Sequence, residues 1–210
     1  MNVNSPSNTL WDLIHGVQAA LVHDGFCETI PPFPAGDSAV RGQAGAYEEL
    51  QVQWGELLDF GQTWPSGQGS QRPKVLLLSP LPLSDSAMAF VRSWFENPKV
   101  KLTLEKDLYF QPLPHFSDPT TASKGFIKEL ARLLAPKVIF SLGPAPAQQL
   151  LGAPLSSDSL RATDYRFDAW SIVTTLDPED FGQLEEGKQN AFKGAVWKDL
   201  QRLLGKVRYG

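Results

Sequence analysis

The chain has 210 residues, of which 42% are hydrophobic, and this suits one α/β domain with an additional arm better than two full domains. A net charge of −4 and a pI near 5.4 argue against strong nucleic-acid binding by bulk charge, because a phosphate footprint needs an excess of Lys and Arg. One cysteine, Cys27, and three dispersed histidines exclude an internal disulfide and a four-ligand metal site, and neither a signal-peptide pattern nor an apolar run of about 18 residues occurs. We therefore expect a cytoplasmic protein with no metal, no cofactor and no membrane contact.

The first 72 residues predict an arm of two amphipathic helices joined by flexible chain. Apolar residues recur at helical spacing in residues 8–26 and again in residues 46–60. Pro, Gly and small polar residues dominate the segments that follow. Each helix carries a tryptophan, Trp11 and Trp54, and Trp is a preferred anchor at protein interfaces. Both residues are therefore candidates for partner binding, and docking of the arm on its own domain is the alternative.

Residues 73–210 predict a three-layer α/β/α domain with a four-stranded, mainly parallel sheet. Continuous apolar runs, typical of strands buried on both faces, lie at residues 74–80, 107–114, 137–143 and 170–178. Helical patterns follow these runs, at residues 84–97, 120–134, 144–152 and 190–205, and Ser84 or Asp85 is suited to cap the first of them. Regular alternation of strand and helix is the pattern of a parallel sheet covered on both faces.

The loops that follow the four strands contain the candidate site. Ligands of such sheets bind beyond the carboxyl ends of the strands. The residues at these ends are Ser79 and Pro80, then Gln111 and Pro112, then Gly143, and finally Asp177. We take these six residues as the lining of a pocket.

Four segments of the second half, taken in order, resemble the C-terminal half of the uracil-DNA glycosylase superfamily. They contain a strand ending in Leu-Gly before an Ala-rich helix and Leu-Leu-Gly, then a Leu-Arg dipeptide, then a strand running into Thr-x-x-Pro, and a last helix with Trp-x-Asp-Leu. The iron–sulfur branch of bacteria and archaea is the most similar pattern. Residues 75–114 match it only in layout. The resemblance implies a glycosylase-like form of the α/β fold and a role in DNA repair or replication in bacteria.

The sequence departs from the superfamily at the residues that carry its chemistry. A Gly-Glu-Ala-Pro-Gly pattern after the first strand is replaced by Ser-Pro-Leu-Pro-Leu from Ser79 on, which removes the water-orienting carboxylate. Gln111 and Pro112 stand where an Asn reads the base, Asp177 stands where the family has His, and the cluster cysteines are missing. An ionised Asp beside a departing uracil anion would raise the barrier. The resemblance therefore implies a degenerate member without the family's catalytic activity.

Several of these residues also have simpler interpretations. Asp177 in an Asp-Pro turn is expected to end a strand and to accept a hydrogen bond from a nearby backbone N–H. It would serve catalysis only if burial kept it protonated. Arg161 and Arg166 are interpreted as solvated or paired with acids such as Asp164, although contact with a phosphate is the alternative. The basic last helix is interpreted as a solvated face.

Three functions remain open from the sequence. The leading hypothesis is a protein-interaction subunit of the replication or repair machinery, because the psi-subunit family of bacterial clamp loaders combines this fold with an N-terminal Trp-containing segment. The second is an active DNA glycosylase that flips uracil or another damaged base into the pocket with substituted residues. The third is a nucleotide or nucleic-acid binder without turnover, which the acidic pI disfavours. The first hypothesis implies a protein partner and at most weak DNA contact.

Overall fold

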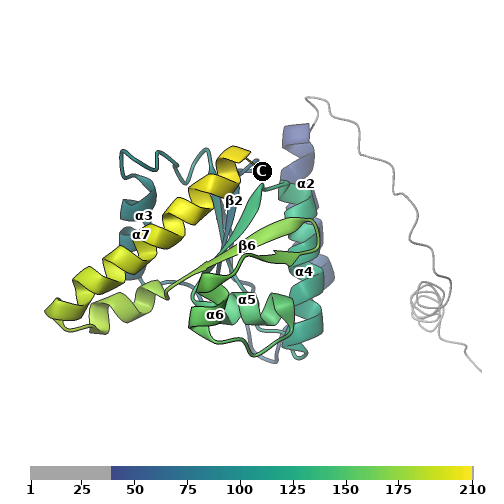
Figure 1. Cartoon of the computed structure of the whole chain (residues 1–210). Coiled ribbons are helices and arrows are strands. Elements are labelled where there is room, and N and C mark those ends of the chain that lie inside the picture. Colours follow the sequence, from purple (N-terminus) through teal and green to yellow (C-terminus); the bar gives the residue numbers. More distant parts are fainter. Residues whose placement is uncertain (1–38, 210) are drawn as a thin grey trace, which may run out of the picture. The chain divides into compact units, whose positions relative to one another are not determined.

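The computed structural model describes residues 39–209 of the chain (Figure 1). The predicted helix of residues 8–26, with Trp11, lies outside the described residues. The described residues belong to one compact unit. Within the described residues, no helix is long and apolar enough to cross a membrane.

A six-stranded mixed sheet forms the centre of this α/β unit, in the order β1-β3-β2-β4-β6-β5. The four inner strands run parallel and are β2 (Val75–Ser79), β3 (Leu108–Pro112), β4 (Val138–Leu142) and β6 (Trp170–Thr175). The two edge strands are antiparallel to their neighbours and are β1 (Gln68–Gly69) and β5 (Tyr165–Phe167). The expected number of four strands is therefore wrong. The edge strands contain two and three residues, too few for a periodic pattern, and they form by pairing with a neighbouring strand.

Helices cover both faces of the sheet, because the inner strands are apolar on both sides. One face carries α3 (Asp85–Phe95) and α7 (Glu186–Tyr209), which pack on residues such as Leu77 and Phe140. The opposite face carries α2 (Ala39–Gly55), α4 (Pro119–Leu134), α5 (Pro144–Leu151) and α6 (Ser157–Ala162). A short 3-10 helix, η1 (Pro178–Gln183), follows β6. The α6 helix was not expected from the sequence.

Local signals fix where several helices begin and end. Ser84 caps α3, because its side chain accepts a hydrogen bond from the N–H of Ala87, so Ser84 rather than Asp85 is the cap. Asp118 caps α4 ahead of Pro119, which cannot donate and suits a first turn. Gly152 ends α5 with a φ of 67°, a conformation that glycine adopts without strain.

The α2 helix lies alongside α4 (Figure 1). Leu50 of α2 is buried in the core that α4 shares with the sheet, and Tyr47 and Trp54 pack against the same core. At least this part of the predicted arm is therefore docked on the domain that contains the sheet.

Candidate functional site at the strand ends

The order of the parallel strands places a topological switch point between β2 and β4. The chain passes from β2 to β3 on one side and then returns to place β4 on the other side of β2. Loops that leave the carboxyl ends of such a strand pair diverge, and they leave a crevice in which ligands of open α/β sheets bind. Ser79 ends β2 and Gly143 follows β4, so both lie at this switch point. Asp177 follows β6 and lies beyond the carboxyl ends of the same parallel strands.

Ser79 and Pro80 do not offer a catalytic group to this crevice. The Ser79 side chain is fully buried, and its hydroxyl donates to the carbonyl of Leu81 across 2.5 Å. This bond keeps the donor inside the loop that follows β2. Pro80 has no N–H with which to bind an anion. The loop after the first inner strand is therefore structured by its own polar contacts.

Gln111 is a structural residue whose amide is occupied within the protein. It is fully buried on β3, and its Nε2 donates to the carbonyls of Pro65 at 3.0 Å and Pro112 at 2.7 Å. Its Oε1 accepts from the hydroxyl of Tyr47 at 2.8 Å. Since α2, the segment after it and β3 itself supply these partners, the amide is not free to read the edge of a base.

Gly143 and Asp177 are brought into direct contact. Gly143 has a φ of 84°, and a Cβ built on it would lie 3.2 Å from both Cβ and Oδ2 of Asp177. A side chain at this position would therefore be strained by the backbone and crowded by the carboxyl group. The glycine at the end of β4 allows the Asp177 side chain to lie against the turn into α5.

Asp177 is the cap of η1, as the Asp-Pro turn predicts. Its Oδ1 accepts from the backbone N–H of Glu179 at 3.0 Å. Burial raises the pKa of Asp177 above its ordinary value, and this N–H partly opposes the rise. The carboxylates of Asp180 and Glu179 raise the pKa further. Asp177 therefore forms the turn after β6, and its carboxyl group is more easily protonated than that of an exposed aspartate.

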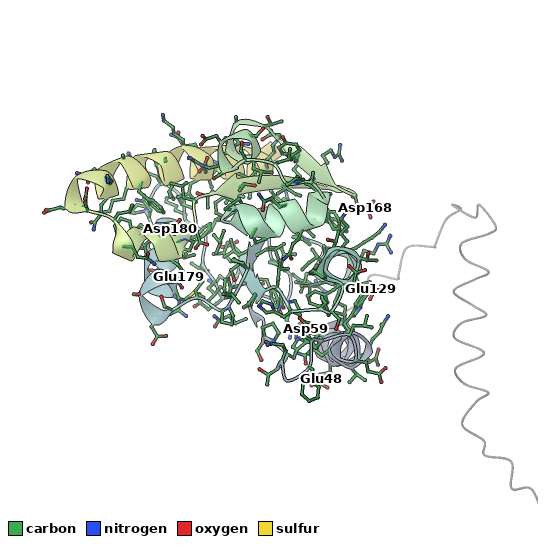
Figure 2. The ribbon with its side chains drawn as sticks, turned by 90° about the horizontal axis from the view of Figure 1, so that it is seen from below. Glu48, Asp59, Glu129, Asp168, Glu179 and Asp180 are labelled. Atoms are coloured by element: carbon green, nitrogen blue, oxygen red, sulfur yellow. The ribbon has the colours of Figure 1, made fainter. Side chains whose placement is uncertain are left out.

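Hydrogen bonds join the loop that follows β2 to the loop that follows β6. Glu179 accepts from the backbone N–H of Ser84 at 2.6 Å and from its hydroxyl at 2.9 Å, so η1 is tied to the start of α3 (Figure 2). The rings of Phe90 in α3 and Phe181 in η1 also stack, with centroids 4.0 Å apart. These contacts hold the two loops together, and Glu179 is already engaged by α3.

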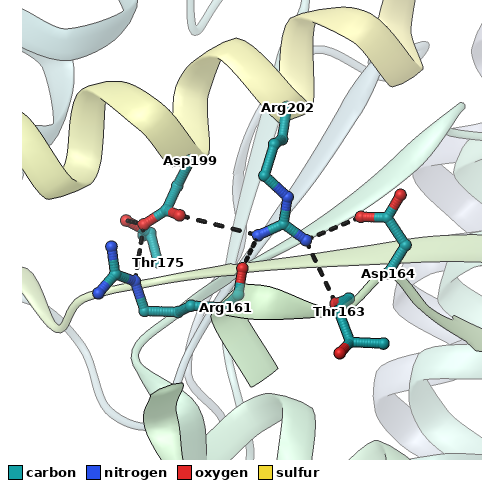
Figure 3. Close-up of polar contacts among 6 residues, drawn as sticks. All are labelled: Arg161, Thr163, Asp164, Thr175, Asp199 and Arg202. Atoms are coloured by element: carbon teal, nitrogen blue, oxygen red, sulfur yellow. Dashed lines mark hydrogen bonds and ion pairs between the residues drawn. The ribbon is translucent and has the colours of Figure 1, made fainter. Parts of the chain in front are cut away.

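Residues from three of the segments that carry the family resemblance meet in one buried network (Figure 3). Asp199 of α7 is 3% exposed, and its Oδ2 accepts from Arg161 Nε at 2.9 Å and from the Thr175 hydroxyl at 3.0 Å. Burial raises the pKa of Asp199, and the bonds from Arg161 and Thr175 oppose that rise. The network joins α6, β6 and α7 just before the loop of Asp177, so its role is to position that loop.

The outer part of this network corrects one expectation, that of a solvated last helix, whereas the expected pairing of Arg161 with an acid is confirmed. Arg202 was interpreted as part of a solvated helix face, but it donates to the carbonyls of Arg161 and Thr163 and to Asp164 Oδ1 at 2.7 Å. Lys206 pairs with Asp164 Oδ2 at 2.6 Å. The partner of Arg161 is Asp199, which sequence reasoning did not single out, and the only signal for it was the Trp-x-Asp-Leu motif.

Trp54, the second partner-binding candidate, is held by α4. Its indole Nε1 donates to Glu129 Oε2 at 2.8 Å, and its ring packs edge-on against Phe116 and Phe126. Gly125 of α4 leaves room for the indole, because a Cβ there would collide with it. Trp54 is half-buried, and its polar atom is already satisfied.

Four hollows of the described surface lie away from the six candidate residues. These hollows are lined by other parts of the chain, and none of the four includes Ser79, Pro80, Gln111, Pro112, Gly143 or Asp177. In the part of the chain that the structure describes, no group of three or more His, Cys, Asp or Glu residues is arranged to hold a metal ion.

Comparison with known proteins adds no family to this description, since no family model matches the chain and no curated protein matches it. The structure shows an α/β protein in which Ser79, Gln111 and Asp177, at or after the strand ends, form hydrogen bonds with other groups of the same chain. The likeness to uracil-DNA glycosylases stays a prediction from the sequence.

Proposed function

We propose that this chain is a degenerate member of the uracil-DNA glycosylase superfamily that acts as a protein-interaction subunit in DNA replication or repair, similar in role to the psi subunit of a clamp loader. In this proposal the parallel strands β3, β2, β4 and β6 are the four-stranded glycosylase-like core. The edge strands β1 and β5 are additions to that core. The assignment to replication or repair rests on the sequence resemblance.

The non-catalytic part of the proposal rests on one observation, that the side-chain amide of Gln111 is hydrogen-bonded within the protein. A residue that reads a base needs an amide open to a ligand, whereas all three hydrogen bonds of the Gln111 amide go to Tyr47, Pro65 and Pro112. Freeing this amide would leave buried polar groups without partners, which costs about 1–3 kcal/mol for each group. The same protein contacts that stabilise the domain therefore oppose base recognition.

Affinity capture from the native cells tests the proposed function. The full-length tagged chain should enrich at least one replication or repair protein, in near-stoichiometric amount and reversibly, by quantitative mass spectrometry. A tagged chain of unrelated fold and similar pI serves as the control. If the enriched proteins include none from replication or repair, the assignment to that machinery fails.

A second candidate, an active DNA glycosylase, is favoured by one observation. Burial raises the pKa of Asp177. A protonated carboxyl at this position would donate a hydrogen bond to a departing base instead of repelling its charge. Excision assays on single- and double-stranded DNA that contains uracil separate the two candidates. Turnover by the pure wild-type chain, lost in Asp177→Ala, would establish the enzyme and end the non-catalytic proposal.

A further inference from the structure

The segment from the end of α2 to residue 60 exposes apolar side chains to an unusual degree. Val52, Leu57 and Phe60 are 75%, 49% and 106% exposed. They account for three of the four large apolar side chains that are exposed in the described part of the chain, and the fourth is Leu81. Single exposed apolar residues are ordinary on protein surfaces, but several close together in the chain point to an interaction site.

These side chains are exposed on a segment that is tied to the domain. Leu58 and Phe116 form an antiparallel bridge, and Leu58 packs against the core. On either side of this bridge, the N–H of Asp59 donates to the carbonyl of His115 at 2.8 Å and the N–H of Ser117 donates to the carbonyl of Leu57 at 3.2 Å. The exposure of Leu57 is therefore a property of a fixed backbone.

A groove of about 440 Å³ has one of the exposed residues, Leu57, in its lining. Its apolar lining comes from Trp54, Leu57 and Ala122. Glu56 and Asp118, both acidic, complete its wall together with Ser117 and Thr121. The groove combines apolar side chains with carboxylates in its lining, a combination that suits one face of an amphipathic helix.

The charged side chains of the segment that follows the middle of α2 have one sign. Glu48, Glu49, Glu56 and Asp59 are all exposed, and residues 45–71 contain no Lys, Arg or His. None of these four carboxylates forms an ion pair with another described residue. Figure 2 labels Glu48 and Asp59 on the part of the domain that contains α2. We call Val52, Glu56, Leu57, Asp59 and Phe60 the acidic–apolar patch.

We propose that the acidic–apolar patch is the docking surface for a basic amphipathic segment of a protein partner. Apolar residues of that segment, at helical spacing, occupy the groove beside Trp54 and cover Leu57 and Phe60. Lysines or arginines flanking them meet Glu56 and Asp59. This inference deepens the proposed interaction function and rests on it.

Charge complementarity selects this occupant over the others. A second copy of the chain would bring the same carboxylates against themselves, and like charges facing one another across an interface oppose association. Nucleic acid and anionic lipid are repelled for the same reason. A basic segment gains from both the apolar contact and the opposite charge.

Direct binding of a synthetic peptide tests the surface. The probe is a short fluorescein-labelled helix of Leu and Lys in an amphipathic pattern, titrated with the full chain by fluorescence anisotropy, and a Leu and Glu peptide of the same pattern is the control. The Leu and Lys peptide should bind, more weakly as salt is raised, and the Leu and Glu peptide should not. Equal binding of the two peptides, or none of the first, would overturn the proposal.

Variants locate the binding on the chain. Phe60→Ser and the double variant Glu56→Lys with Asp59→Lys should each weaken binding by about tenfold or more, as loss of an interface anchor does. Leu81→Ser is the matched control, because it removes an exposed leucine outside the patch, and it should change binding by less than about twofold. An unchanged affinity in Phe60→Ser contradicts the assignment.

Two further measurements distinguish an error in the occupant or the docking surface from an error in the proposed function. If sedimentation velocity detects a dimer that Phe60→Ser dissolves, a second copy occupies the patch and the proposed occupant is wrong. In the cell-capture experiment, a replication or repair partner that Phe60→Ser retains would uphold the function and refute the patch. Peptide binding lost in Phe60→Ser, without capture of any such partner, would uphold the patch and refute the function.

Discussion

Arg161 donates from Nε to Asp199 Oδ2 across 2.9 Å and thereby joins α6 to α7. The two side chains are 18% and 4% exposed, so the pair is shielded from water on both sides. Thr175, the last residue of β6, donates to the same oxygen. The contact therefore fixes the end of the strand from which the loop of Asp177 departs.

Asp199→Ala should destabilise the protein strongly, because it leaves the guanidinium of Arg161 buried without its partner. We expect the free energy of unfolding to fall by about 3 kcal/mol or more, measured by urea denaturation. Asp164→Ala removes a more exposed carboxylate of the same network, and the loss should be about 1 kcal/mol or less. Equal losses in the two variants would contradict the central role of Asp199.

Gln111→Leu separates a structural glutamine from one that recognises a ligand. The change leaves the O–H of Tyr47 without its acceptor and the carbonyl of Pro65 without its donor, so the free energy of unfolding should fall by about 1–3 kcal/mol. In a double-mutant cycle with Tyr47→Phe, the two losses should not add, because both variants remove the same bond. Full additivity, or a normal stability of Gln111→Leu, would indicate that the amide is held free for another purpose.

Gly125→Ala should destabilise the domain although alanine is the better helix former. An alanine Cβ at this position of α4 would collide with the indole of Trp54. Gly194→Ala in α7 is the matched control, since nothing lies within 4 Å of its Cβ, and it should gain about 0.5–1 kcal/mol. In a Trp54→Ala background the effect of Gly125→Ala should change sign. A gain from Gly125→Ala in the wild-type background would show that Trp54 does not pack on α4 in this way.

Asp177→Asn should stabilise the protein at neutral pH and not at acidic pH. The folded-state pKa of Asp177 is raised above 3.8, so the folded protein holds its proton more tightly than the unfolded chain does. Stability is then lost as the pH rises from 3.8 through the folded-state pKa, and the uncharged amide avoids that loss. The difference in free energy of unfolding between variant and wild type should grow with pH across this window. A constant difference would mean that the carboxyl group titrates normally.

Asp177→His should not create uracil excision. It restores the residue type that the resembling enzymes use, but the loop after β2 still lacks a carboxylate and the Gln111 amide stays engaged. Groups of a catalytic site act as a unit, so one of them recovers little alone. The excision rate on uracil-containing DNA should equal that of the wild type, and stability should change by about 1 kcal/mol at most. Measurable excision by the variant would mean that the strand-end loops open to admit a base.

Sequence patterns were sufficient for the features that depend on neighbouring residues. Each inner strand was expected from an apolar run, since a strand covered on both faces needs no polar side chain. The Asp177 turn was likewise expected, and so was a cap at either Ser84 or Asp85, because a side chain that bonds the backbone two or three residues ahead is a local event. These signals determined the class of the fold and the positions of the loops.

Only the tertiary structure decided which candidate side chains are free to contact a ligand and which are engaged by other residues of the chain. Gln111 is closed by Tyr47, which lies 64 residues earlier in the chain, and Arg161 is paired with Asp199, which lies 38 residues later. The edge strands likewise exist only because longer strands offer them free backbone groups to pair with. Periodicity and capping reach over a few residues, whereas the partner of a buried polar group is chosen when distant elements pack and every buried donor and acceptor must be satisfied.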